Sequence, residues 1–509
     1  MIQRILTVGG FTLVSRVTGF LRDIFMAAVL GAGPVADAFL VAFRLPNHFR
    51  AIFAEGAFSA AFVPAYARVR HQNGSEAARF FGDRIFTILL VSQLCLLGLA
   101  FLFTPEVIRL LAPGFENDPE RFALAVSLTR ITFPYLLMMT MVTLFSGILV
   151  ALDKFASASG APILLNVTMI AALALAFFFP TAGHAAAWGV LIAGCLEVLL
   201  LAADAGRSGV ITRLRWPRWD ADVKQFFVAL GPAVVGSAGI QLALFADTII
   251  ASFLPAGALS ALYYADRLNQ LPIGVIGIAV GTVILPEMTR RLASGDDVGA
   301  QQVQSRAIEF ALLLAVPCLV AFMLVPEFIM RALFVRGAFT SSDAASAAIT
   351  LAAYAIGLIP FVLIRSVVAT FFARGDTATP VKAALIAVAV NIGFKILLTG
   401  PLAQVGLAFA TSIGAWINFA LVLWFGTRAG LMKFEFGFLR TIMKLAGAGA
   451  ILAAALWMLR RPVIGFFGAE TGLHAIGALI ALAVIGVVVY GLAVVAFFGK
   501  AGIARLRGA

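Results

Sequence analysis

Five arginines lie within long apolar stretches of this chain, where charged side chains are rare: Arg16, Arg22, Arg44, Arg50 and Arg267. A guanidinium stays protonated, and placing one at the centre of a membrane helix costs at least about 2.5–3.5 kcal/mol. Arginines at that depth therefore face a protein interior or a water-filled cavity rather than lipid. A cavity lined by several arginines predicts an anionic cargo.

The spacing of the first two arginines suits an extended anion. Arg16 and Arg22 are six residues apart, which is about 9 Å along an α-helix. Two charges at that separation match an anion with several charged groups better than a single carboxylate. The alternative is that these arginines are neutralised by fixed pairs with Asp23, Asp37 or Glu55.

Other polar residues share the same apolar stretches. We expect the following residues to orient a polar cargo or to form gate pairs: Asp37, Asn47, Arg50, Ser260 and Asp266. Tyr263 and Tyr264 are expected to pack or to lie at an interface. A lone ion pair between Asp266 and Arg267 is the alternative for those two charges.

A second polar set lies in apolar surroundings in the C-terminal half: Asp247, Asn391, Lys395 and Thr411. One interpretation is an ion or coupling site for a monovalent cation. We favour the other interpretation, a buried bridge between Asp247 and Lys395, because the lysine supplies the positive charge that a bound sodium ion would otherwise provide.

The composition is that of a membrane protein. Of 509 residues, 62% are hydrophobic and 12% charged, whereas soluble domains average about 45–50% and 25%. Apolar runs recur along the chain without alternation at every second residue, which predicts membrane-spanning helices and not a β-barrel. The net charge of +12 is explained by cytoplasmic loops and the cavity, so we expect no nucleic-acid partner.

Several kinds of site are absent from the sequence. The three cysteines and four histidines are scattered, which favours neither disulfides nor a metal site. No nucleotide-binding or hydrolase motif is present, so the sequence predicts a transporter without a resident cofactor and not an enzyme.

The apolar runs predict about fourteen transmembrane helices, at residues 5–30, 36–67, 85–104, 122–151, 158–179, 184–203, 225–253, 258–289, 307–330, 344–373, 380–399, 404–427, 437–459 and 472–498. If the N-terminus is cytoplasmic, 23 of the 37 basic residues fall in cytoplasmic segments and six in the opposite loops. This asymmetry predicts that both termini are cytoplasmic. The other eight basic residues are intramembrane: Arg16, Arg22, Arg44, Arg50, Arg130, Arg267, Arg365 and Lys395.

An internal repeat recurs at a spacing near 223 residues. The corresponding pairs include Asp23 with Asp247, Gly33 with Gly257, Arg44 with Arg267, Gly114 with Gly337, and Asp153 with Asp376. Six spans per repeat is an even number, so the two copies share one orientation. We therefore expect an all-α polytopic protein with two six-helix lobes, related by a pseudo-two-fold axis along the membrane normal.

The repeat sets the expected domain boundaries. Residues 1–204 form the N-lobe, 205–224 an amphipathic cytoplasmic linker, 225–430 the C-lobe, and 431–509 two further C-terminal spans. Within the linker, residues 211–224 mix tryptophans with basic side chains, which favours an interfacial helix. The two extra spans are expected either to pack against the lobes or to form a groove for a lipid tail.

Three motifs carry a resemblance to a known family. The strings SRVTGFLRDIFMAAVLGAGPVADAFLVAFRLPNHFRAIFAEGAFSAAFVP (15–64), YYADRLNQLPIGVIGIAVGTVILP (263–286) and RGDTATPVK (374–382) resemble the MurJ family of lipid II flippases, also called MviN. The resemblance implies the multidrug/oligosaccharidyl-lipid/polysaccharide exporter fold, with a central cavity and a C-terminal groove for the undecaprenyl tail. The implied substrate-binding positions are Arg16, Arg22, Asp37, Asn47, Arg50, Ser260, Asp266 and Arg267.

Two residues depart from the family pattern. Gln270 stands where some relatives carry an acid, and Lys395 occupies what resembles an acidic cation-ligand position. The second departure argues against sodium coupling and leaves the membrane potential as the expected driving force.

The resulting hypothesis is a flippase in the bacterial inner membrane. It would move lipid II, the undecaprenyl-pyrophosphoryl-linked peptidoglycan precursor, from the cytoplasmic to the periplasmic leaflet by alternating access. The expected partners are lipid II, membrane lipids and, as an open alternative, cell-wall synthesis proteins. The alternative functions are a flippase for another polyprenyl-linked glycan, a multidrug exporter of the same fold, and a non-transporting scaffold.

Overall fold

The computed structural model describes residues 2–52, 58–216, 218–432, 436–468 and 472–506. Its described part is helical, without a β-strand. The chain divides into two compact units, residues 1–259 and residues 260–509. The lobe boundaries and the pseudo-two-fold axis expected from the sequence remain predictions.

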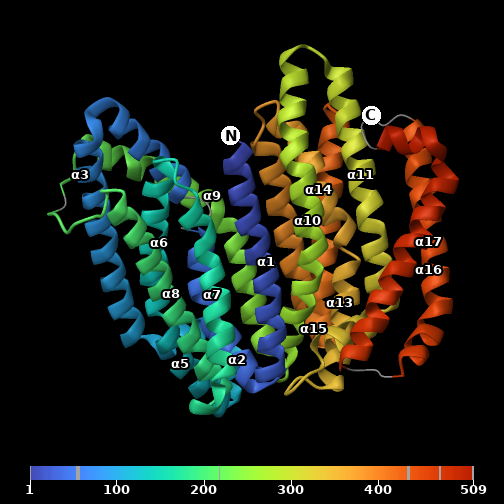
Figure 1. The fold of residues 1–509 in the computed structure, drawn as a ribbon, viewed down its shortest axis with the longest axis horizontal. Helices are drawn as coiled ribbons and strands as arrows, with labels where there is room; N and C mark the ends of the chain where they lie inside the picture. The colour runs from blue at the N-terminus through green and yellow to red at the C-terminus, as the bar shows by residue number, and fades with distance from the viewer. Residues whose placement is uncertain (1, 53–57, 217, 433–435, 469–471, 507–509) are drawn as a thin grey trace. The chain divides into compact units, whose positions relative to one another are not determined.

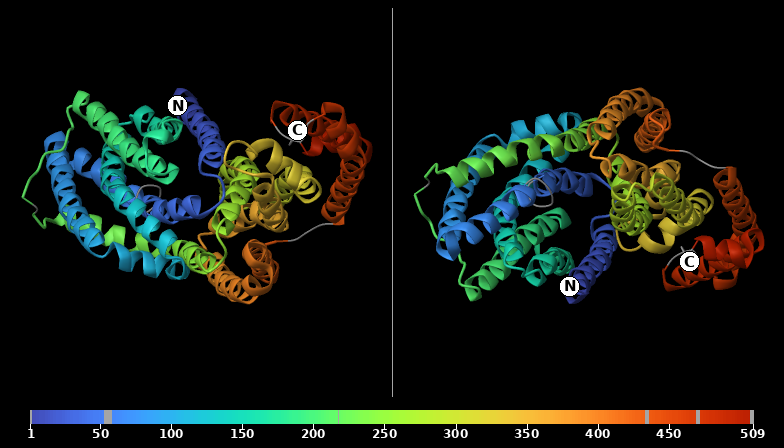
Figure 2. Two further views of the ribbon diagram at one scale, coloured as in Figure 1. Left: turned by 90° about the horizontal axis from the view of Figure 1, so that it is seen from below. Right: turned by 90° about the horizontal axis from the view of Figure 1, so that it is seen from above.

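The described residues of the first unit form the α-helices α1 to α9, most of them labelled in Figure 1, and the short 3₁₀ helices η2 and η3. They are α1 (Ile2–Leu30), α2 (Pro34–Ile52), α3 (Phe58–Leu102), α4 (Thr104–Leu111), η2 (Pro113–Asn117), α5 (Pro119–Thr132), α6 (Pro134–Ala151), α7 (Ala156–Ala174), η3 (Ala176–Phe178), α8 (Ala182–Arg207) and α9 (Ala221–Ser252). In both views of Figure 2 the dark-blue α1 lies beside the teal α7, and these two helices are in contact.

The second unit holds the remaining helices, with α10 beginning two residues before the boundary. They are α10 (Ala258–Ala293), α11 (Asp297–Leu324), α12 (Pro326–Phe334), α13 (Ser341–Ala355), α14 (Leu358–Phe372), α15 (Ala378–Arg428), α16 (Phe436–Phe467) and α17 (Gly472–Leu506). The C-terminal helices α16 and α17 pack side by side as a pair (Figure 1).

Nine helical segments within the described ranges are long and apolar enough to cross a membrane. This finding agrees with the predicted all-α polytopic class. The number of fourteen spans stays a prediction. Two of the nine segments, α3 and α15, each consist of two helical arms joined at a break, so the number of segments is not the number of membrane crossings. In α15, Ala403 has a non-helical conformation (φ 48°, ψ −131°). This break falls between the predicted spans 380–399 and 404–427.

The segment between the predicted spans 36–67 and 85–104 is helical apart from a break at Gly74 (φ 86°, ψ 174°). Glycine adopts such a positive φ without the clash that a Cβ would cause. The two arms of α3 pack on one another, with the rings of Phe62 and Phe81 stacked at 5.8 Å. The polar sequence of this segment therefore marks a helical hairpin that extends past the apolar region.

The interfacial helix predicted over residues 211–224 is wrong. Described residues from 211 to 220 have no helix, and α9 begins only at Ala221. This extended segment binds α3 instead: Asp83 accepts a hydrogen bond from the backbone N–H of Arg213 (2.8 Å) and pairs with the Arg215 guanidinium (3.2 Å). Backbone groups bound in this way are unavailable for a helix, so tertiary contacts override the amphipathic pattern.

The order of elements repeats between the units. The short amphipathic helix α4 and the helices α5 to α8 follow one another in the first unit. The short helix α12, then α13, α14 and the two arms of α15, follow in the same order about 222 residues later. Element order thus agrees with the repeat seen in the sequence.

Candidate functional site

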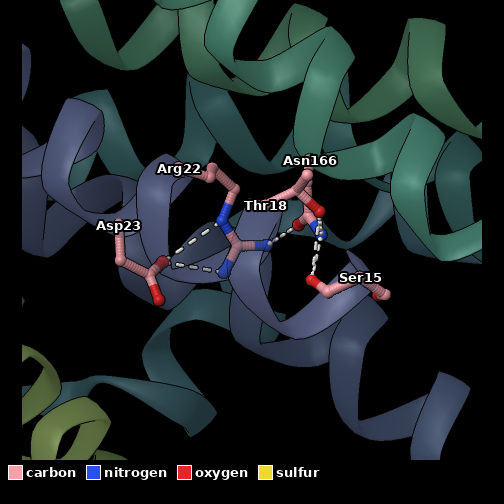
Figure 3. Close-up of polar contacts among 5 residues, drawn as sticks. All are labelled: Ser15, Thr18, Arg22, Asp23 and Asn166. Atoms are coloured by element: carbon pink, nitrogen blue, oxygen red, sulfur yellow. Dashed lines mark hydrogen bonds and ion pairs between the residues drawn. The ribbon is translucent and has the colours of Figure 1, made fainter. Parts of the chain in front are cut away.

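Arg22 lies at the centre of a polar network between α1 and α7 (Figure 3). Its Nε and one terminal nitrogen donate to Asp23 Oδ1 at 3.1 and 2.7 Å, and its other terminal nitrogen donates to Asn166 Oδ1 at 3.0 Å. Asn166 in turn donates to the Ser15 carbonyl (3.0 Å) and to Thr18 Oγ1 (3.1 Å). These five residues, here called the α1–α7 network, tie α1 to α7.

Local sequence explains how this network fits between two helices. Gly19 faces the Asn166 side chain, and a Cβ at this position would lie 3.4 Å from Nδ2. Arg22 and Asp23 are only 8% and 3% exposed. A buried arginine that is both paired and hydrogen-bonded avoids most of the cost of removing its charge from water. The structure thus shows the pairing alternative for Arg22, with its sequence neighbour as the acid.

Arg16, six residues earlier on the same helix, has opposite surroundings. Its side chain is exposed, and within the described part of the chain no hydrogen bond or ion pair joins it to another group. The flanking Leu13 and Val17 are also exposed, at 64% and 54%. Among the described side chains of α1, Arg16 thus presents an exposed guanidinium beside the apolar Leu13 and Val17.

Asp37 forms a second closed ionic cluster in the first unit. The carboxylate is 0% exposed, and its Oδ2 accepts from the Arg121 guanidinium and from the Gly257 backbone N–H, both at 2.7 Å. The Arg121 guanidinium also lies 3.9 Å from the centre of the Phe115 ring. Asp37, Arg121 and Gly257, called the Asp37 clamp below, join α2, α5 and the turn after α9.

A close backbone contact between Gly114 and Ser252 also holds the turn after α9. Gly114 donates its backbone N–H to Ser252 Oγ at 3.0 Å. A Cβ on Gly114 would lie 2.4 Å from the Ser252 carbonyl oxygen, so only glycine fits there. Gly257 has a φ of +90°, which also favours glycine. Both glycines belong to the pairs of the internal repeat. In this unit the tight packing of the turn after α9 explains why glycine occupies both positions.

The remaining candidates of the first unit are less constrained. Arg44 and Asn47 on α2 and Asp247 on α9 are half-buried. The side chains of Arg50 and Glu55 lie outside the described residues, so the predicted roles of Arg50 and the pairing of Glu55 have no structural description.

In the second unit, α10 carries three candidates at its start. Ser260 is fully buried, while Asp266 and Arg267 are half-buried. Gln270 donates to Asp266 Oδ1 at 3.4 Å, and the Arg267 guanidinium lies 4.8 Å from the centre of the Tyr263 ring. A cation over an aromatic face is stabilised without losing its hydrogen-bond donors. Asp266 and Arg267 thus remain partly accessible.

The aromatic neighbour of this cluster packs as predicted. Tyr264 is 0% exposed. Its ring lies 5.4 Å from Phe334 and 5.3 Å from Phe339, which come from α12 and the segment after it. These contacts fix the start of α10 against the rest of its unit.

The second polar set lies on α15. Asn391 donates to the Ala410 carbonyl at 2.8 Å, across the two arms of this helix, and Thr411 donates to the Leu407 carbonyl at 3.0 Å. Lys395 is 2% exposed. An ammonium at that depth requires a counter-charge or several acceptors. No group of three or more metal-ligating side chains occurs among the described residues.

Sequence reasoning missed two residues of these clusters. Asn166 was treated as part of an apolar span, although a single amide there is a signal for a polar partner. Arg121 was assigned to a loop, whereas it is 5% exposed in the first turn of α5. Nothing in its local sequence links it to Asp37, which lies 84 residues away.

The chain matches a known protein family over most of its length. The profile of the family described as lipid II flippase MurJ matches residues 26–468. A probable lipid II flippase MurJ from Rhizobium tropici is 39% identical over 501 residues, covering 96% of this chain and 94% of the relative. The lipid II flippase MurJ from Burkholderia cenocepacia is 34% identical, covering 90% of this chain and 89% of the relative.

Solved structures show the same fold. A lipid II flippase MurJ in an inward closed conformation matches with a TM-score of 0.80 at 24% identity, covering 96% of this chain and 98% of that one. An inward-facing multidrug transporter of the MATE family matches with a TM-score of 0.65 at 15% identity, covering 85% and 95%. By the profile match and the sequence relatives, the chain belongs to the MurJ family of lipid II flippases, which are transporters and not enzymes.

Proposed function

We propose that this protein moves lipid II from the cytoplasmic to the periplasmic leaflet of the bacterial inner membrane. Family membership supports the cargo, and the asymmetry of basic residues supports cytoplasmic termini. The headgroup of lipid II carries a pyrophosphate and peptide carboxylates, so the site that carries it must bind anions in an apolar setting.

The observation that carries this proposal is the free guanidinium of Arg16. It is exposed on α1 beside the exposed apolar side chains of Leu13 and Val17, and no described group neutralises it. A guanidinium binds phosphate oxygens through paired, charge-assisted hydrogen bonds. Arg16 would therefore contact the pyrophosphate directly.

Arg267 would supply a second contact from α10. Its guanidinium lies 4.8 Å from the centre of the Tyr263 ring, and the residue is only half-buried. Asp266, Asn47 and Arg50 would bind sugar or peptide groups. Ser260 is fully buried, so its role would be to fix the start of α10.

Arg22 and Asp37 would act in a state-dependent way. Both charges are neutralised by protein groups in this conformation, so contact with cargo requires those pairs to open. Exchange of a protein partner for a cargo group would couple binding to movement of α1 or α2. Alternating access follows if the cargo binds the two conformations with different affinity.

The membrane potential would drive the outward step. An inside-negative potential is worth about 2.3 kcal/mol per charge per 100 mV. A pyrophosphate with about two negative charges would therefore gain some 4–5 kcal/mol, provided that no protein charge moves in compensation. The buried Lys395 would stand in place of a bound cation, so we propose transport without sodium coupling.

Depletion of the protein in cells tests this function. Lipid II should accumulate in the inner leaflet, and wild-type protein should relieve the accumulation while Arg16→Ala and Arg267→Glu proteins should not. Membrane levels of each variant must match the wild type. The proposal fails if lipid II distribution is unchanged on depletion. Accumulation of a different polyprenyl-linked glycan would instead support the alternative cargo.

A further inference from the structure

The segment that joins α8 to α9 carries an exposed surface of aromatic, aliphatic and basic side chains. Leu214, Trp216 and Trp219 are 68%, 88% and 73% exposed. Arg213 and Arg218 alternate with them in the sequence and are also exposed. These side chains are called the linker surface below. A patch of large apolar side chains on a surface marks a place where a protein or a membrane binds.

The first half of this segment is held against α3. Besides the hydrogen bond from the Arg213 N–H to Asp83, the backbone N–H of Arg215 donates to Thr87 Oγ1 at 3.0 Å. The Arg215 guanidinium pairs with Asp83 and lies 3.9 Å from the centre of the Phe80 ring. Arg215 is thus bound by α3, and we do not count it in the linker surface.

The second half of the segment is held by α3 and by the start of α9. Asp220 pairs with Arg84 and accepts a hydrogen bond from the Val223 N–H at 2.9 Å, which caps α9. The Trp219 ring packs edge-on against Phe227, with 5.1 Å between the ring centres. Both halves are therefore fixed, and the linker surface projects from a backbone of defined position.

The contacts with α3 place the segment at the end of a predicted membrane span. Asp83 lies just before the predicted span 85–104, and Thr87 lies in its first turn. The second arm of α3 belongs to a helical segment that is apolar enough to cross a membrane. In both views of Figure 2 the green segment runs along the outer edge of the first unit, beside the blue α3. This is the level at which lipid headgroups surround a membrane protein.

The side chains of the linker surface suit such a place. Tryptophan is enriched where the hydrocarbon meets the headgroups. Arginine binds phosphate oxygens through charge-assisted hydrogen bonds. In the orientation proposed above, the segment lies at the cytoplasmic leaflet, whose anionic lipids attract basic side chains.

We propose that the linker surface binds anionic phospholipids of the cytoplasmic leaflet. Trp216 and Trp219 lie among the headgroups, and Arg213 and Arg218 contact the phosphates. The ligand is bulk membrane lipid and not the transported molecule. The depth fixed by α3 favours lipid over a cytosolic protein, which would need a surface raised above the headgroups.

Tryptophan fluorescence of the full-length protein in phospholipid vesicles tests the depth. The chain has six tryptophans, so the signal is the fluorescence that Trp216→Phe/Trp219→Phe protein lacks. Lipids brominated close to the headgroup should quench this signal more strongly than lipids brominated near the chain end. Quenching by neither lipid would overturn the proposal and leave a cytosolic protein as the partner. Equal quenching by both would also overturn it, since the rings would then have no preference for the headgroup level.

The charge of the ligand is tested in vesicles that mix phosphatidylglycerol with phosphatidylcholine, with only one of the two brominated. Brominated phosphatidylglycerol should quench the same signal about twofold more than brominated phosphatidylcholine, because the two arginines attract anionic lipid. Arg213→Gln/Arg218→Gln protein should lose this preference.

The matched control is Arg70→Gln/Arg290→Gln, which removes two exposed arginines of predicted cytoplasmic segments outside the linker surface. It should keep the preference, and each variant is measured against its own form with both tryptophans replaced. Circular dichroism and gel filtration confirm folding. The proposal fails if the wild type shows no preference, if the preference survives in Arg213→Gln/Arg218→Gln, or if the control loses it equally. The vesicles contain no lipid II and the same lipids in both leaflets, so these results are independent of the proposed transport.

Discussion

The helices α2 and α10 occupy the same place in the two sequence repeats, yet they carry different charges. With Arg44 aligned on Arg267, Asp37 falls opposite Ser260, and Phe43 falls opposite Asp266. Asp37 and Ser260 are both fully buried. The acid of α2, Asp37, is thus fully buried. The acid of α10, Asp266, is half-buried and precedes Arg267 in the sequence.

This difference separates two uses of charge in the membrane. The Asp37 clamp and the α1–α7 network are closed by protein partners and hold helices together. The α10 cluster and Arg16 keep charged groups accessible. The repeat therefore preserves the order of helices while the chemistry of matching positions diverges.

Replacing Asp37 of α2 by serine, the residue at the matching position of α10, should have the largest effect on stability. Asp37→Ser leaves the Arg121 guanidinium buried without its carboxylate, which costs about 3–5 kcal/mol. Ser260→Ala, at the matching position, should cost only about 1 kcal/mol. Thermal unfolding of the purified proteins measures both. Equal losses for the two variants would contradict the contrast drawn between the positions.

Breaking the α1–α7 network should have the next largest effect. Arg22→Gln removes a paired charge and leaves Asn166 and Asp23 with fewer donors, at a cost of about 1.5–3 kcal/mol. Asn166→Ala together with Arg22→Gln should cost less than the two single losses combined, since both act in one network. Additive losses in this double-mutant cycle would show that the two residues are not coupled.

Helix caps at matching positions should have equal, smaller effects. Asp118 accepts from the Arg121 N–H at the start of α5, and Thr340, 222 residues later, accepts from the Asp343 N–H at the start of α13. Replacing either by alanine should cost about 0.5–2 kcal/mol. A cost in only one unit, measured by thermal unfolding, would show that these ends are not equivalent.

The smallest effect should appear in a pH profile. A hydrogen bond from the Gly299 N–H and the pairing with Arg291 lower the pKa of Asp296, while the matching residue in the first unit is Asn73. A lowered pKa stabilises the fold at pH above the unfolded value and loses that effect as the pH falls through the folded value. Asp296→Asn should therefore be less stable than wild type at pH 7.

The same variant should equal the wild type once the pH falls below the folded pKa of Asp296. Melting temperatures measured from pH 7 down to about pH 2 check whether the difference disappears as the pH falls through that pKa. A difference that stays constant across that range would show that ionisation of Asp296 contributes nothing.

Sequence alone predicts the helical class and the family, because apolar runs and motif strings are local features. It also places the break between the arms of α15. It fails at residues 211–220, where contacts with Asp83 decide the backbone. Sequence alone also predicts the same role, cargo binding, for Arg16 and Arg22. The structure separates them, because the packing of α1 against α7 leaves Arg16 exposed and brings Arg22 to its distant partner Asn166.

The central claim is that the exposed guanidinium of Arg16 on the apolar helix α1 binds the cargo. Its most direct test is the rate of lipid II translocation by Arg16→Gln protein reconstituted in vesicles, measured beside its melting temperature. Since Arg16 has no described partner, the melting temperature should match the wild type while the rate falls at least tenfold. A wild-type rate in a correctly folded Arg16→Gln protein would contradict the claim.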